Sequence, residues 1–109
     1  MTRIESPPVS YFAVRRARGP AWNGAVPMRE QVLWSEHAVF MNALAAEGFV
    51  VLGGPLGTGE EVLLVVEAAG ENALRARLAG DPWSSAGLLV IARVEPWTIL
   101  LRHHRALTG

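Results

Sequence analysis

The chain has 109 residues, the size of one domain, and half of them are apolar. It can therefore bury a hydrophobic core without disulfides or a structural metal ion. It contains no cysteine, which excludes a disulfide framework and a thiolate zinc site. Ten basic residues, all of them arginine, balance ten acidic ones, and a neutral chain has no general field that attracts nucleic acid. We therefore expect a single domain over residues 1–109 without a nucleic-acid partner.

The apolar residues form no pattern typical of export or membrane insertion. The first letters, MTRIESPPVSYF, lack the apolar run of a signal peptide. No apolar stretch approaches the roughly 18 residues that span a bilayer. The expectation is a soluble, cytoplasmic protein with no membrane partner.

The first predicted elements are a lead-in, a strand and a long loop. Residues 1–8 end in two prolines, and residues 9–16 mix the β-branched and aromatic side chains typical of a strand. Residues 17–27, ARGPAWNGAVP, carry the Gly, Pro and Asn of a loop. Because long loops in compact domains often cover binding sites, we expect Ala17–Ala25 near a pocket mouth and more mobile than the strands.

A helix is predicted from about Pro27 to Glu47. Proline suits the first turn, where its missing N–H would be unpaired anyway, and Gly48 stands where a left-handed C-terminal cap belongs. One face of this helix carries residues at 4-3-4 spacing, which are Leu33, His37, Phe40 and Leu44.

The remaining elements alternate strands and helices. A strand at 49–52 runs into a turn at Gly53-Gly54-Pro55, and a second strand follows at 61–68. After a helix at 70–79 comes a short turn with Asp81 at its N-cap and Pro82 at its first position. The chain ends in a strand at 87–95 and a polar tail at 101–109. This β-α-β-β-α-β order is that of a ferredoxin-like α+β domain, with a four-stranded antiparallel sheet and two helices on one face.

The strands also predict a homodimer. When helices cover one face of a sheet, the other face is expected to be polar and the strands alternate. Three strands instead look apolar on both faces, unless their shortness misleads: Phe49–Leu52, Val62–Val66 and Leu88–Ile91. Such a face would exceed the exposed apolar patches of monomers, and a second copy is the simplest cover.

His37 and Asp81 are the candidate catalytic pair. A histidine on an apolar helix face is most often a core residue, and an aspartate before proline is most often an N-cap. However, Asp81 is the only aspartate, it ends the second helix, and both helices pack on the same sheet face. A buried imidazole needs polar partners, so we expect a ring nitrogen within hydrogen-bonding reach of this carboxylate. A carboxylate there would fix the tautomer and raise the basicity of the other nitrogen.

Arginine and tryptophan side chains are candidates for substrate binding. Arg15, Arg16 and Arg93, on the first and last strands, either neutralise an anionic substrate or are solvated charges at the sheet edge. Trp83 and Trp97 either form a flat aromatic wall or pack in the core or a dimer interface.

Other site types have weak support. Ser84 and Ser85 stand outside any Gly-x-Ser-x-Gly elbow, and the glycines at 53–57 lack the Gly-Lys-Ser/Thr signature of a phosphate loop. One core histidine and one aspartate are too few metal ligands, and the adjacent His103 and His104 do not share a face. Heme binding through His37 stays open, but a carboxylate-paired histidine favours acid–base work. We expect no metal and no cofactor.

Several motifs together resemble one family. A helix containing histidine, then Gly-Phe-Val-Val-Leu-Gly-Gly-Pro-Leu, then a helix ending in Asp-Pro, then a strand ending in Val-Glu-Pro-Trp, is similar to the YCII-related (YciI-like) family of the dimeric α+β barrel superfamily, over residues 9–100. The resemblance implies a ferredoxin-like dimer whose pocket brings together His37 and Asp81. The longer loop at 17–29 departs from shorter members and bears on pocket shape.

The resemblance implies a site more firmly than a substrate. One relative is similar to a dehydrochlorinase of a chlorinated hydroxyquinol, and the superfamily includes isomerases, monooxygenases and heme-active proteins. The leading hypothesis is a small dimeric lyase or isomerase that uses His37 as a base and Asp81 as its orienting partner. The alternatives are a non-catalytic module that binds a small aromatic or acidic molecule, and an interaction unit of a larger assembly.

Overall fold

The computed structural model describes residues 10–101 and 103. The predicted lead-in, His104 and most of the predicted tail lie outside these residues. The elements are, in chain order, β1 (Ser10–Arg18), the 3-10 turn η1 (Met28–Glu30), α1 (Trp34–Ala46), β2 (Val50–Leu56), β3 (Glu61–Ala68), α2 (Glu71–Leu78), α3 (Pro82–Ser85) and β4 (Leu89–Trp97).

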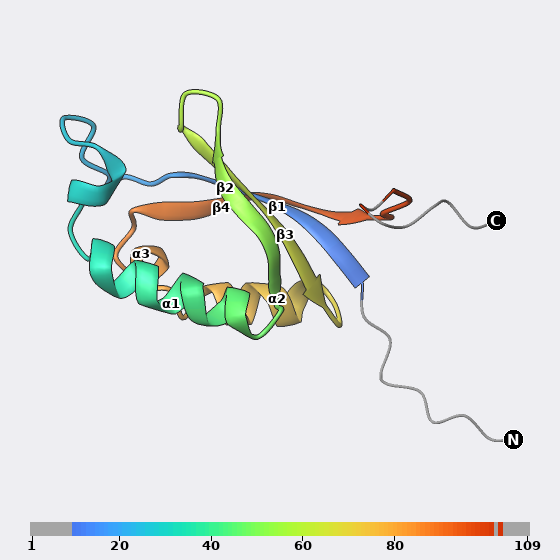
Figure 1. Cartoon of the computed structure of the whole chain (residues 1–109). Coiled ribbons are helices and arrows are strands. Elements are labelled where there is room, and N and C mark those ends of the chain that lie inside the picture. Colours follow the sequence, from blue (N-terminus) through green and yellow to red (C-terminus); the bar gives the residue numbers. More distant parts are fainter. Residues whose placement is uncertain (1–9, 102, 104–109) are drawn as a thin grey trace, which may run out of the picture.

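The four strands form one antiparallel sheet in the order β2-β3-β1-β4. Figure 1 shows the helices gathered on one face of this sheet. The expected α+β class and the four-stranded antiparallel sheet are confirmed, and the strand order is compatible with a ferredoxin-like arrangement. In the described part of the chain, no helix is long and apolar enough to cross a membrane.

The main core lies between the sheet and the two longer helices. Alternate residues of β1 and β3 point to the helices and are buried, as the period of two in a strand requires. They meet apolar residues of α1 and α2, and the cluster includes Phe12, Val14, Leu64, Val66, Leu44, Leu74 and Leu78. A second cluster, Trp83, Leu88 and Leu89 with Trp22, Met28 and Trp34 against it, joins α3 to the loop before α1.

The first helix begins later than predicted. Only the short turn η1 follows Pro27, and α1 starts at Trp34. The helix does not extend back through Leu33, because the backbone of Leu33 is left-handed, with φ 62°. The side chain of Gln31 is buried and hydrogen-bonds the backbone N–H and carbonyl of Asn23 and the carbonyl of Val26. These contacts hold residues 23–31 as a closed loop instead of a helical turn.

The Gly53-Gly54-Pro55 segment is a strand and not the predicted turn. It pairs with residues 62–64 of β3, and the turn falls at residues 57–60. Proline has no backbone N–H to donate to a neighbouring strand, but Pro55 can join the sheet because β2 is an edge strand. Gly53 permits close pairing, since a Cβ there would lie 2.6 Å from Leu64 Cδ2.

The helix-free face of the sheet is mixed rather than apolar throughout. The central strand β3 does place apolar Leu63 and Val65 on it. The next two strands of the sheet, β1 and β4, place charged residues there: Arg15 lies opposite Arg93, and Ala13 lies opposite Glu95. The expectation of two apolar faces therefore applies to β3, whereas β4 carries Arg93 and Glu95 on the helix-free face, as ordinary antiparallel strands with one polar face do.

The backbone at Gly19, just after β1, lies so close to the backbone at Gly87, just before β4, that position 19 has no room for a side chain. A Cβ on Gly19 would lie 2.2 Å from the carbonyl oxygen of Gly87. We expect Gly19→Ala to lower the free energy of unfolding by about 1–3 kcal/mol, because the backbone must shift to relieve the overlap. Urea denaturation measures this. Gly24→Ala is the control, since a Cβ at Gly24 would meet nothing within 4 Å; equal losses in both variants would contradict the packing argument.

Candidate active site

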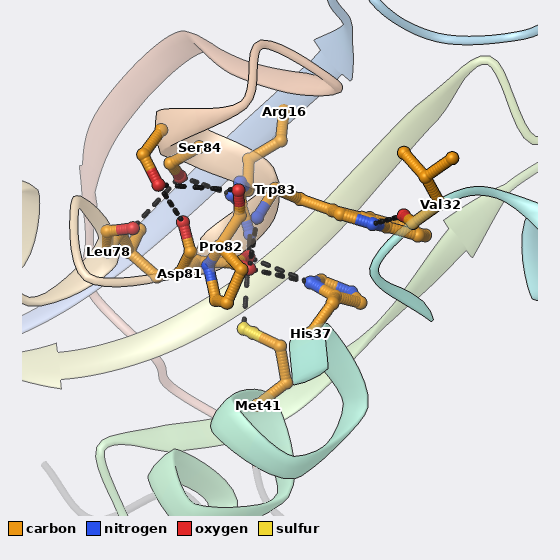
Figure 2. A network of polar contacts seen from close by, with 10 residues as sticks. Arg16, Val32, His37, Met41, Leu78, Asp81, Pro82, Trp83 and Ser84 are labelled. Carbon is orange, nitrogen blue, oxygen red and sulfur yellow. Dashed lines mark hydrogen bonds and ion pairs between the residues drawn. The ribbon is translucent and has the colours of Figure 1, made fainter. Parts of the chain in front are cut away.

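His37 is held in the first turn of α1, directly after the left-handed Leu33. Its backbone N–H donates to the carbonyl of Leu33 at 2.9 Å, which anchors the start of the helix. The residue is 9% exposed, and its side chain points at α3 (Figure 2). The interruption at Leu33 thus brings the histidine to the boundary between the helix and the loop at 19–33.

Asp81 meets His37 at the N-terminus of α3. Its carboxylate accepts the backbone N–H of Trp83 at 2.9 Å, which is the predicted N-cap, and Pro82 occupies the first position of the helix. His37 Nδ1 lies 2.9 Å from each carboxylate oxygen. The expected contact between the two side chains is confirmed, and so is the capping role of Asp81.

Arg16 is the third member of the network, from the helix face of β1. Its side chain is 1% exposed, and one terminal nitrogen donates to Asp81 Oδ2 at 2.9 Å. The other donates to Ser84 Oγ at 2.7 Å, and Ser84 in turn donates to the carbonyl of Leu78. Its Nε is buried without a hydrogen-bond partner among the described residues. This role of Arg16 was missed, although its alternation with Phe12 and Val14 marked the buried face of the strand.

The surroundings keep the Asp81 carboxylate ionised. Burial by itself would raise its pKa, because burial disfavours the charged form. The hydrogen bond from His37, the N–H of Trp83 and the positive charge of Arg16 outweigh burial, so the pKa lies below its ordinary value. An ionised carboxylate only accepts hydrogen bonds, so Nδ1 of His37 carries the proton that is shared with Asp81.

This tautomer leaves Nε2 as the free nitrogen of His37. It has no hydrogen-bond partner among the described residues, and the ring lines a cavity of about 450 Å³. In a neutral imidazole whose Nδ1 is protonated, Nε2 carries a lone pair. The site therefore presents an oriented base to the cavity, with a buried charge behind it.

Aromatic side chains pack against the imidazole ring of His37. The rings of His37 and Trp83 are stacked, with centroids 3.8 Å apart and planes 10° apart. Trp83 is itself fixed, because its indole N–H donates to the carbonyl of Val32 at 2.7 Å. Trp22 meets Trp83 edge-on at 5.4 Å, and Trp34 is tilted against both His37 and Trp83. Of the two predicted wall residues, Trp83 does lie beside His37.

The cavity lies between α1, β2 and the tryptophan cluster. Trp22 and Met28 of the loop line it, so the predicted position of this loop near a pocket is confirmed, and its predicted mobility stays a prediction. The strand β2 lines it with residues 50–55, including the glycines that were expected in a turn. Apart from Arg16, Arg18, His37 and Asn42, the described lining residues are apolar, aromatic or glycine.

The other predicted binding residues do not share this cavity. Arg15, Arg93 and Trp97 lie on the helix-free face, where Arg15 pairs with Glu61 at 3.5 Å and Arg93 with Glu95 at 3.2 Å. Arg15 and Trp97 line a separate hollow of about 300 Å³ there. Their role in substrate binding stays a prediction.

Comparisons with known proteins add no relative. No family model, no curated protein and no solved structure matches the chain. Among the described residues, no group of three His, Cys, Asp or Glu side chains is placed to hold a metal ion.

Replacing Asp81 tests the buried network. We expect Asp81→Asn to lower the free energy of unfolding by about 3–5 kcal/mol at pH 7, because Arg16 is left as a buried charge without a counter-charge. The folded-state pKa of Asp81 is lowered, so its contribution is present above the unfolded value of about 3.9 and is lost as the pH falls through the folded value. The difference between the two proteins should therefore shrink below about pH 4.

Urea denaturation between pH 7 and pH 3 measures both effects. Glu61→Gln is the matched control, because the Glu61–Arg15 pair has side chains that are each 43% exposed. Its loss should stay below about 1 kcal/mol. A difference between wild type and Asp81→Asn that does not change with pH would exclude the ionised carboxylate as its source.

Proposed function

We propose that the chain is an acid–base enzyme of the lyase or isomerase type that acts on a small aromatic or acidic molecule. The observation that carries this proposal is the pairing of His37 Nδ1 with the buried Asp81 carboxylate, which leaves Nε2 free at a cavity. Cavities of roughly 300–1,000 Å³ with apolar walls and a few polar groups are typical of small-molecule sites. The resemblance to the YCII-related family, with its His and Asp pair, supports the same proposal.

The proposed chemistry is a proton transfer at Nε2. The lone pair takes a proton from an activated carbon of the ligand, and the electron pair of the broken C–H bond stays on the ligand. In a lyase this electron pair expels a leaving group from the neighbouring carbon. In an isomerase the imidazolium returns the proton to another atom. Asp81 stabilises the imidazolium, since the two side chains already share a 2.9 Å hydrogen bond.

Arg16 acts in this proposal as a positioning residue. Its 2.9 Å ion pair with Asp81 keeps the carboxylate ionised and turned toward Nδ1. Because Asp81 is fully buried, it reaches a ligand only through the imidazole. The network thus divides the work: Arg16 and Asp81 orient and polarise the ring, and His37 contacts the ligand.

The alternative is a module that binds the same molecule without turning it over. Asp81 caps α3 and pairs with Arg16 in either case, so these contacts do not separate the two functions. The separation depends on whether Nε2 removes a proton. A readout of proton transfer that needs no knowledge of the natural substrate is therefore required.

Deuterium exchange from D₂O provides this readout. We expect the wild-type protein to speed the exchange of an acidic C–H in members of a panel of small ring-bearing ketones and acids, followed by proton NMR. His37→Gln removes the base and should slow that exchange by about 10²–10⁴-fold. His103→Gln is the control, because it changes a histidine that does not line the cavity. Panel members that bind to wild type without faster exchange would favour the binding module.

We also propose that two copies pair through their helix-free sheet faces. The support is the apolar residues that this face carries beside its charges: Leu63 of β3, and in β4 Val90, which is 43% exposed, and Trp97, which is 45% exposed. The arginine and glutamate residues of the same face can pair across a two-fold axis, since such an axis places one patch against its own copy. A dimer is also what the family resemblance implies.

Sedimentation at micromolar concentration tests the dimer. The wild type should sediment with twice the mass of one chain. Leu63→Arg should shift it to the monomer, because the substitution places an unpaired charge on the inner strand β3 of the interface. Val39→Arg is the matched control, since Val39 is 70% exposed but lies on α1. A monomeric wild type, or a loss of the dimer in both variants, would contradict this interface.

A further inference from the structure

The ionisable groups that line the cavity leave one positive charge without a partner. Among the described lining residues these groups are Arg16, Arg18 and His37, and no carboxylate lines the cavity. The charge of Arg16 is balanced by Asp81 at 2.9 Å. Arg18 therefore supplies the unbalanced charge of the cavity wall, and a cavity with such a wall favours an anionic ligand.

Arg18 is unusual among the arginines of this chain. It has no carboxylate partner among the described residues, and only Arg29 shares this property. The other described arginines form the pairs Arg15–Glu61, Arg16–Asp81, Arg75–Glu71, Arg77–Glu47 and Arg93–Glu95. Arg18 is thus free to bind an acidic group that the protein does not itself provide.

The guanidinium of Arg18 is held in place at the mouth of the cavity. It lies over the ring of Trp22, with its central carbon 5.0 Å from the ring centroid. It also borders the turn between β2 and β3, because a Cβ on Gly59 would lie 3.8 Å from its terminal nitrogen. Trp22 and Gly59 both line the cavity, and the pairing of Ala17 with Glu61 places the end of β1 beside this turn.

Stacking on Trp22 suits a guanidinium for binding an anion. The ring contacts the flat face of the group, so the N–H donors at its edge stay available for a carboxylate. The tryptophan also limits the rotation of a long side chain, so less freedom is lost when a ligand binds. A ligand whose ring lies among Trp22, Trp34 and Trp83 would have one end near His37 and can direct its other end to Arg18.

We infer that Arg18 binds the carboxylate of an aromatic acid and makes the cavity select such acids over their neutral analogues. This inference rests on the proposed function in placing the ligand beside His37, but it does not require turnover. It assigns to Arg18 a specificity role, and it commits the ligand to one class, a small aromatic molecule with an anionic group.

Isothermal titration calorimetry with two probes tests this. The probes are 2-naphthoate and its neutral analogue 2-naphthamide, at pH 7 and low salt. The wild type should bind naphthoate about tenfold more tightly than naphthamide, as one charge-assisted contact provides. Arg18→Gln should weaken naphthoate binding about tenfold and leave naphthamide binding within about twofold.

Arg29→Gln is the matched control for this experiment. Arg29 is also exposed, lies over a tryptophan of the same cluster at 5.4 Å and has no carboxylate partner among the described residues, but it does not line the cavity. It should keep the full preference for naphthoate. An unchanged preference in Arg18→Gln, an equal loss in both variants, or failure of the wild type to bind naphthoate would overturn the inference.

The two proposals fail in different ways. A preference for naphthoate that depends on Arg18, together with no deuterium exchange in any panel member, would leave the binding site standing and remove the catalytic role of His37. Deuterium exchange that depends on His37 but is unaffected by Arg18→Gln, for acidic and neutral compounds alike, would support the catalytic role of His37 and remove the specificity role of Arg18.

Discussion

The buried carboxylate of Asp81 is the constraint on which the rest of the site depends. A fully buried charge is tolerated only when it is paired and hydrogen-bonded, and Asp81 is fully buried. Its donors come from three elements: Arg16 from β1, His37 from α1 and the Trp83 N–H from α3. Satisfying one carboxylate therefore positions a strand and two helices relative to each other. The same contacts orient the imidazole, so the stability of this region and the geometry of the proposed base have one source.

A local strain supports this arrangement. Leu33 has a left-handed backbone, which costs a residue other than glycine about 1–3 kcal/mol. It is held there from both sides, because its carbonyl accepts the N–H of His37 and the neighbouring Val32 carbonyl accepts the indole N–H of Trp83. The left-handed residue separates α1 from the loop at 19–33, and Trp22 of this loop packs against Trp83. The cavity wall and the start of α1 thus depend on the same few hydrogen bonds.

Several features could be predicted because they depend on neighbours in the chain. The period of the apolar residues placed His37 on the inner face of a helix, and Asp-Pro placed Asp81 at a helix N-cap. The bounds of β3 were predicted exactly, since this central strand is a clean β-branched and leucine-rich run. The start of α1 and the path through Gly53 were predicted wrongly. They depend on the side chain of Gln31 reaching back to Asn23, and on a β3 partner that accepts glycine and proline at a sheet edge.

The sequence by itself determined the class of fold, the type of most elements and the inner faces that carry His37 and Asp81, because periodicity and caps act over a few residues. Only the tertiary structure decided which arginine is buried against Asp81 and which ones face away. Arg15 and Arg16 are adjacent, and strand alternation sends them to opposite faces of the sheet. Which face meets the carboxylate depends on a contact between positions 65 residues apart, and no local pattern specifies such a contact. The cavity and the position of Arg18 in its wall are set in the same way, by segments that meet only in the folded chain.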